Sequence, residues 1–436
     1  MLKAGFSRLD VTPPFGAELA GYYTVRNADG ILDPIYINSV ALSNETETVL
    51  LMAIDFIGIN IDYNLRIRES ISARTGLPLD HIFVSAMHQH TSCALDHSFS
   101  RLTDDVYISV LIRKFADAAQ MAIDDMKEAK IGSAALETAE PIAFVRRYFA
   151  EDGSVHTNPN TDKVKIVKRC DEADNTVRLV RLFREEAKDI AIVNFSTHPD
   201  VIGGTKFSAD WMGFTRRFVE ADNPDILCAF FTGTQGDSNH IDFFKPKEER
   251  IKGNSINGSK RYGHSEYMGR TVADTVKAIW DTVEPLDDDS IFTEYTVVYN
   301  KTNTEGIDEY DKYKAICEAY DNRTVDINTV DIAYAHRIVN LRKSPILRPI
   351  PITVIGIGNI AFVGFGGEPF SAYGRYVRAL APEKFIVCAV CTNGYEGYFP
   401  TEDAFAQGAY EARSSLFTPT VEKEITGAID GILKKF

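Results

Sequence analysis

Residues 49–90 read VLLMAIDFIGINIDYNLRIRESISARTGLPLDHIFVSAMHQH. A short apolar run opens this stretch, a segment with apolar residues at helical spacing follows, and a second apolar run closes it. The pattern predicts strands at Val49–Ile54 and Ile82–Ala86 and a helix at Tyr63–Arg74, which ends before the stop signal Gly76. Strands that alternate with helices are typical of an α/β protein.

The same alternation continues along the rest of the chain. Further strands are expected at Ile190–Phe195, Ile226–Phe231, Ile360–Phe365 and Phe385–Val390. Further helices are expected at Asp104–Lys127, Met212–Glu220, Gly263–Val283 and Thr420–Leu433. We therefore predict an α/β fold in which helices flank a mixed β-sheet core, organised as one domain over residues 1–436.

Residues 301–343 differ from their surroundings because they are rich in charge and in tyrosine. Two helices are expected there, at Tyr310–Tyr320 and Asp331–Arg342. A flexible linker would contain more Gly, Ser and Pro. We interpret the segment as a helical insertion within the same domain.

Composition excludes several classes of protein. The chain has 436 residues, with 62 Asp and Glu against 47 Lys and Arg, which gives a net charge of −15 and argues against nucleic-acid binding. No apolar stretch reaches the roughly 18 to 20 residues that span a bilayer. Residues 1–16, MLKAGFSRLDVTPPFG, do not resemble a signal peptide. We expect a cytoplasmic protein without a transmembrane segment.

Polar residues follow several of the expected strands. VSAMHQH contains His88 and His90, VNFSTH ends at His198, and FVGFGGE ends at Glu368. Ligands of open α/β sheets bind at the carboxyl ends of the strands, so these residues are expected to converge. His88 and His90 are two apart and would leave the same face of a strand. Imidazole nitrogens together with a carboxylate oxygen suit zinc.

Other polar residues are candidates for supporting roles. Tyr395 and Tyr398 follow the strand in VCAVCTNGYEGY. Asp55 and Asp237 could accept the remaining ring N–H of metal-bound histidines, which usually pair with a carboxylate or a carbonyl. Asp210 is expected to cap the helix that begins beside it.

Seven segments also occur in a recognisable order. They are AGFSRLDVTPPFGAELAGY (4–22), VSAMHQHTS (84–92), FVRRY (144–148), FSTHPDVIG (195–203), GTQGDSNH (233–240), GGEPF (366–370) and YEGYFPTEDAFAQGAYE (395–411). Their order and spacing resemble those of neutral/alkaline (non-lysosomal) ceramidases and their shorter bacterial relatives. The resemblance covers nearly the whole chain and implies the fold of the ceramidase catalytic domain. Ceramidases also carry a C-terminal immunoglobulin-like domain, so the chain looks like the catalytic domain alone.

The resemblance implies a role for each matching residue. It implies a Zn²⁺ ion held by His88, His198, Glu368 and Tyr398. It also implies a substrate pocket lined by His90, Arg146 and Tyr410, beside the carbonyl oxygen or its oxyanion. Zinc polarises a carbonyl and lowers the pKa of water, and neighbouring donors stabilise the oxyanion.

The chain departs from the ceramidase pattern at Asn239. Ceramidases have a catalytic serine at this position of the segment similar to GTQGDSNH, and here Ser238 stands one place earlier. We expect that no serine nucleophile operates. Asn239 would instead donate a hydrogen bond to an oxyanion or orient water, and Ser238 is a minor alternative if the loop is displaced by one residue.

These expectations combine into a zinc-dependent hydrolase that cleaves an amide bond through a metal-activated water. Its substrate would be an N-acyl compound smaller or more polar than ceramide. An esterase using the same site is an alternative, because the tetrahedral intermediate is of the same type. A non-catalytic, metal-dependent small-molecule binding protein is another. A sugar or nucleotide enzyme without metal finds no support, because the chain has no G-x-G-x-x-G or Walker loop.

Overall fold

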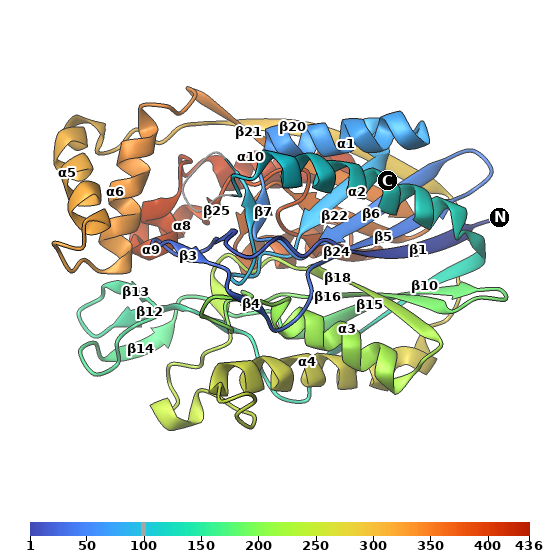
Figure 1. Ribbon diagram of the computed structural model, residues 1–436, viewed down its shortest axis with the longest axis horizontal. Coiled ribbons are helices and arrows are strands. Elements are labelled where there is room, and N and C mark those ends of the chain that lie inside the picture. The colour runs from blue at the N-terminus through green and yellow to red at the C-terminus, as the bar shows by residue number, and fades with distance from the viewer. Residues whose placement is uncertain (97–101) are drawn as a thin grey trace.

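Two β-sheets that pack face to face form the centre of the computed structural model, which describes residues 1–96 and 102–436 (Figure 1). The larger sheet contains, in order across it, β18 (Ile226–Thr232), β16 (Asp189–Phe195), β15 (Thr176–Arg184), β10 (Lys127–Glu137), β1 (Lys3–Asp10), β5 (Tyr36–Ser43), β6 (Thr48–Ile54) and β8 (Ile82–Ala86). The smaller sheet contains β20 (Ile291–Lys301), β21 (Leu347–Ile357), β22 (Ile360–Phe365) and β24 (Phe385–Ala389). Parallel and antiparallel pairs occur in both sheets, so the predicted mixed sheet is confirmed.

Strand–helix–strand units build the parallel pairs of the sheets. Strands β6 and β8 are joined through α1 (Ile61–Thr75), β16 and β18 through α3 (Asp210–Asp222), and β22 and β24 through α7 (Ser371–Leu380). All six strands, α1 and α3 match the sequence prediction to within a few residues, whereas α7 is not among the predicted helices. Parallel strands need such crossovers because their ends lie far apart.

Strand β6 shows why these strands are recognisable in the sequence. Val49 and Leu51 belong to the core between the two sheets, whereas Leu50 and Met52 belong to the core beneath the helices. Both faces of the strand are therefore buried. Such a strand appears as a continuous apolar run rather than as an alternating one.

Helices cover the outer faces of the sheets. Helices α1 and α2 (Asp105–Asp124) pack on the larger sheet, and α7 and α10 (Val421–Leu433) pack on the smaller one. Helices α3 and α4 (Lys260–Ile279) join the central core. Among residues 1–96 and 102–436, no helix combines the length and the apolar composition that crossing a membrane requires.

Two smaller groups of elements stand at one end of the molecule (Figure 1). Helices α5 (Tyr310–Asp321) and α6 (Thr329–Leu341) form the connection between β20 and β21, which pair up to Lys301 opposite Leu347. A small sheet contains β12 (Arg147–Ala150), β13 (Val155–Thr157) and β14 (Ile166–Arg169). Both groups contribute walls to the cavity described below.

Candidate metal centre

Four ligand-type side chains converge at the carboxyl ends of β8, β16 and β22. His88 and His90 follow β8, His198 follows β16, and Glu368 follows β22. Nitrogen atoms of the three histidines lie within 4.8 Å of one another, and Nε2 of His88 lies 3.0 Å from Oε2 of Glu368. The structure therefore brings together residues that are up to 280 positions apart in the chain (368 − 88).

The loop after β8 orients the side chains of His88 and His90. Strand β8 ends at Ala86, and His88 has a φ of +74°, which is uncommon for a residue other than glycine. Its backbone N–H donates to the carbonyl of Phe56 at 2.8 Å. The expectation that His88 and His90 leave one face of a strand is wrong, because the loop and not the pleat brings their rings together.

Outer hydrogen bonds fix two of the imidazole rings. Nδ1 of His88 lies 2.8 Å from the carbonyl oxygen of Ile57, which can only accept, so Nδ1 carries the proton. Nδ1 of His198 lies 2.8 Å from Oε1 of Gln235 and donates to it. Both rings therefore turn an Nε2 lone pair towards the centre of the cluster, the arrangement that metal-binding histidines require.

Acceptor atoms face one another inside the cluster. Nε2 of His88 lies 3.0 Å from Oε2 of Glu368, so a proton or a metal ion must lie between these two atoms. Nε2 of His198 lies 3.1 Å from Nε2 of His90. His88, His198 and Glu368 are at most 2 % exposed, so water does not compensate them. A divalent cation would satisfy these facing lone pairs, and the nitrogen and oxygen donors fit zinc.

The protonation states also fit a cation. Burial lowers the pKa of His90 to about 3, with a further contribution from His88, and burial together with the charge of Arg146 lowers the pKa of His198 well below its usual value. Burial raises the pKa of Glu368, but His88, His198 and Arg146 outweigh this effect and lower it to about 2. Neutral imidazoles and an ionised carboxylate are the forms that bind metals.

Tyr395 and Tyr398 lie next to Glu368. Residues Glu368 and Tyr398 lie opposite each other in the parallel pair of β23 (Glu368–Pro369) and β25 (Tyr398–Phe399). The hydroxyl of Tyr395 donates to Oε1 of Glu368 at 2.9 Å, and the hydroxyl of Tyr398 accepts from Nη2 of Arg146 at 3.1 Å. Burial raises the pKa of Tyr398 well above its usual value, with a further rise from Glu368. Tyr395 therefore positions the carboxylate.

A buried ion pair fixes the guanidinium beside the cluster. Nε of Arg146 donates to Oε1 of Glu411 at 2.7 Å, and Nη2 donates to the carbonyl of Gly236 at 2.8 Å. Glu411 also accepts from Arg147 at 3.1 Å. Burial raises the pKa of Glu411, but the two arginines outweigh it and hold this pKa below the usual value. Arg146 thus presents a fixed positive charge.

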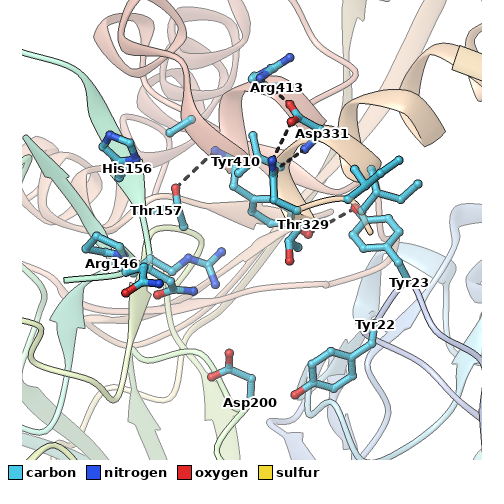
Figure 2. A pocket seen from close by; sticks show the side chains of 18 of the residues that line it. Tyr22, Tyr23, Arg146, His156, Thr157, Asp200, Thr329, Asp331, Tyr410 and Arg413 are labelled. Atoms are coloured by element: carbon cyan, nitrogen blue, oxygen red, sulfur yellow. Dashed lines mark hydrogen bonds and ion pairs between the residues drawn. The ribbon is translucent and has the colours of Figure 1, made fainter. Parts of the chain in front are cut away.

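A cavity of about 770 Å³ opens beside the cluster (Figure 2). His90, His198, Arg146, Tyr398 and Tyr410 line it. Helix α6 and strand β13 supply other parts of its wall. The candidate ligands thus lie next to a space that a small molecule can enter.

Solved structures with the same arrangement of elements are ceramidases. Neutral ceramidase from Pseudomonas aeruginosa matches with a TM-score of 0.73 and 13% identity, over 99% of this chain and 74% of that chain. The fold is that of neutral ceramidase. A second structure, described as ceramidase complexed with C2, matches with a TM-score of 0.74 and 13% identity, over 100% of this chain and 75% of that chain. Comparisons with protein-family models and with curated protein sequences give no match.

In this ceramidase fold, Asn239 stands apart from the cluster. Its Nδ2 donates to Oδ1 of Asn158 at 2.7 Å, and its Oδ1 accepts from the backbone N–H of Ile241 at 3.0 Å. Asn239 lines a neighbouring hollow rather than the cavity beside the histidines. Ser238 is buried, and its hydroxyl lies 3.4 Å from the carbonyl of Gln235.

The aspartates chosen as supporting residues have other partners. Asp55 forms a bidentate buried ion pair with Arg216, at 2.8 and 2.6 Å. Asp237 accepts from the backbone and side chain of Ser371 at the start of α7. The prediction that these aspartates orient the metal-binding histidines is therefore wrong. Asp210 begins α3 and accepts from the backbone N–H of Trp211 at 2.7 Å.

Sequence reasoning missed several residues of this site. Gln235 and the carbonyl of Ile57 accept the ring N–H groups that the aspartates were expected to accept. Gln235 lies in the segment GTQGDSNH, whereas the carbonyl of Ile57 has no sequence signal. Glu411 ends the last ceramidase-like segment, so its position was the available signal. Asp200 follows His198 by two residues and lines the cavity, with Oδ1 3.3 Å from Nδ1 of His240.

Proposed function

We propose that the chain is a zinc-dependent hydrolase that cleaves a carbon–nitrogen amide bond. The observation that carries this proposal is the pair of acceptors formed by Nε2 of His88 and Oε2 of Glu368, 3.0 Å apart and buried. Their outer atoms are already fixed by hydrogen bonds to Ile57 and Tyr395. Two buried acceptors at this distance need a positive charge between them, and a zinc ion would supply it in place of a proton.

His88, His198, Glu368 and Tyr398 are the proposed zinc ligands, and His90 stands at the cavity side of the cluster. A bound zinc ion would polarise the substrate carbonyl and promote ionisation of water. The ceramidase fold supports this assignment, because the proposed ligands lie in segments similar to ceramidase segments.

Residues of the chain itself would stabilise charge on the substrate. The Arg146 guanidinium is held by Glu411 and Gly236, so it can face an oxyanion without first becoming ordered. The hydroxyl of Tyr410 lies 3.4 Å from that of Tyr23 on the cavity wall and is a second proposed donor. His90, whose pKa is lowered to about 3 chiefly by burial, is neutral near pH 7 and can offer a hydrogen bond to the substrate there.

The cavity wall combines apolar side chains, among them Val155, Ile327 and Ile332, with polar ones. The polar side chains include His156, Asn158, Asn160, Asp200 and Asp331. Burying an alkyl chain against such groups would remove their hydration without replacing it. We therefore propose an N-acyl compound smaller or more polar than ceramide.

Zinc analysis and hydrolysis assays together test the function. The purified protein is expected to contain one zinc ion per chain, and to release amine from members of a panel of N-acyl amides. A chelator should abolish this activity, and added zinc should restore it. A matched ester panel decides between amidase and esterase. Stoichiometric zinc without chelator-sensitive hydrolysis of either panel would contradict the proposal and indicate a binding protein.

A further inference from the structure

A second hollow of about 530 Å³ adjoins the cavity beside the histidines. Both spaces are lined by Tyr22, Thr24, Asn158 and Asp200, so they lie on either side of these residues. Figure 2 shows Tyr22 and Asp200 together at one end of the larger cavity. A substrate whose reacting bond lies at the histidine cluster can therefore extend one of its two halves past Asp200 into this hollow.

The hollow carries two guanidinium groups that lack an acidic partner. Nη1 of Arg26 donates to the carbonyl of Gly204 at 2.8 Å, and its Nη2 donates to the carbonyls of Ala20 and His90, each at 2.7 Å. Nη1 of Arg261 donates to the carbonyl of Val201 at 3.3 Å. In the part of the chain that the structure describes, neither arginine has a carboxylate within 4.0 Å.

Asp200 lies where the hollow meets the cavity. Its Oδ1 is 3.3 Å from Nδ1 of His240, which holds the carboxylate from the side of the hollow. Asp200 lines the same cavity as His198, so its carboxylate can face an amide bound at the histidine cluster. A carboxylate accepts hydrogen bonds from an amide N–H and attracts an ammonium group.

Another hollow beside the cluster, of about 190 Å³, has the opposite character. Ile57, Ala94 and Leu416 contribute apolar surface to it, and Asp96 and Glu396 contribute carboxylates. Its described lining contains no Lys or Arg. This lining offers no counter-charge to a negatively charged group but can accept a short apolar acyl chain, so a substrate carboxylate has its counter-charges on the Arg26 and Arg261 side.

We propose that the Arg26–Arg261 hollow is the leaving-amine subsite and that the substrate is an N-acyl amino acid. This inference rests on the amide-hydrolase function proposed above. The free carboxylate of the substrate pairs with Arg26 and Arg261, and Asp200 accepts the amide N–H. Hydrolysis consumes one water, breaks the C–N bond and forms a C–O bond, which gives a carboxylate and the ammonium of the amino acid. Asp200 then pairs with that ammonium.

The experiment compares amides that differ only in the carboxylate. N-acetyl-L-alanine is paired with N-ethylacetamide, and N-acetyl-L-phenylalanine with N-acetylphenethylamine. Zinc-loaded protein is assayed for amine release, and binding of the same four compounds is measured by calorimetry. We expect each carboxylate to raise kcat/KM and the binding constant at least tenfold. Arg261→Gln should remove that preference, and Arg261→Lys should restore part of it.

Two further variants test whether Arg261, rather than another cation, causes the preference for a substrate carboxylate. Arg66→Gln removes an equivalent charge from the exposed surface of α1 and should leave the preference unchanged. Lys163 is an exposed cation on the wall of the larger cavity, with no acidic partner among the described residues. If Lys163→Gln removes the preference and Arg261→Gln does not, the subsite is wrongly placed.

The outcomes separate this subsite from the proposed function. Amide hydrolysis that shows no preference for the carboxylate would overturn the subsite and leave the hydrolase intact. Carboxylate binding that depends on Arg261, without hydrolysis of any amide, would support the subsite and overturn the hydrolase. Asp200→Asn should weaken binding of free L-alanine and L-phenylalanine at least tenfold, and unchanged binding would contradict the role of Asp200.

Discussion

Nε2 of His88 lies 3.0 Å from Oε2 of Glu368, and the two side chains are 2 % and 0 % exposed. The other polar atom of each group already has a partner, since Nδ1 of His88 donates to Ile57 and Oε1 of Glu368 accepts from Tyr395. Nε2 of His88 and Oε2 of Glu368 are therefore the atoms without another partner, and they face each other. The first prediction tests whether a zinc ion binds between these two atoms.

Glu368→Gln should remove zinc while leaving the protein folded. The amide has the shape of the carboxylate, and its NH₂ can donate to Nε2 of His88, so the buried contact keeps a hydrogen bond. The negative charge is lost, and we expect zinc affinity to fall by more than the roughly 10- to 100-fold typical of losing an outer partner. Competition with a chromophoric chelator measures the affinity, and circular dichroism checks the fold. Unchanged affinity would exclude Glu368 as a ligand.

Gln235→Ala tests the outer hydrogen bond to His198. The ring would lose the acceptor that fixes its Nδ1 proton, so zinc affinity should fall about 10- to 100-fold. Asp55→Asn serves as the comparison, because Asp55 pairs with Arg216 and not with a histidine. The Asp55 variant should lower the free energy of unfolding but not the zinc affinity of the folded protein. The reverse result would restore Asp55 to the role that the sequence suggested.

Alanine substitutions at Gly21 and Gly16 distinguish a steric clash with His90 from strain in the backbone. Gly21 has a φ of +96°, and a Cβ placed there would lie 2.5 Å from Nδ1 of His90. Gly16 has a φ of +89°, with no atom within 4 Å of such a Cβ. Both alanine variants should cost roughly 1 kcal/mol of stability from the left-handed backbone. Only Gly21→Ala should also reduce zinc-dependent hydrolysis, because it displaces His90. Equal activity in both variants would show that the position of His90 is unimportant.

The metal-free protein should become more stable as the pH rises from about 3 to 6.5. Burial lowers the pKa of His90 to about 3, so between these values the unfolded chain binds a proton that the folded chain excludes. Glu368, whose pKa falls to about 2 because its histidine and arginine neighbours outweigh burial, acts in the same direction below about pH 4.5. Each group contributes a slope of up to about 1.4 kcal/mol per pH unit.

Urea denaturation at several pH values measures this slope. His90→Gln should reduce the slope above pH 4.5 but not abolish it, because burial also lowers the pKa of His198 and His264. A variant with the same slope as the unmodified protein would show that His90 takes up its proton equally in the folded and unfolded chain.

The parallel strands were predictable from the sequence, and several antiparallel ones were not. Strand β6 is buried on both faces, so its whole length is apolar. Strand β10 (Lys127–Glu137) has the sequence KEAKIGSAALE, whose Ala, Lys and Glu favour a helix, and it is a strand because it pairs with β15. Strand β15 contains Arg178, Arg181 and Arg184, which pair with Asp174, Asp189 and Asp125. These three charges interrupt the apolar run that would otherwise mark the strand.

Some residues of the site could likewise be predicted from the sequence, and others could not. His88, His198 and Glu368 follow recognisable strands, so their convergence could be anticipated from topology. Of the groups that hold them, the phenol of Tyr395 was a candidate from the sequence, whereas the carbonyl of Ile57 and the amide of Gln235 were not. The choice of Asp55 and Asp237 failed because both carboxylates are engaged by nearer cations or helix termini.

Helices α5 and α6 leave β20 and return to β21 at the paired residues Lys301 and Leu347. The two ends of this excursion are neighbours, so a short turn could replace it without disturbing the hairpin beneath. Residues of α6 nevertheless form part of the cavity wall. A change in the length of these helices would therefore alter the cavity wall and leave the histidine cluster, which lies at the strand ends, in place.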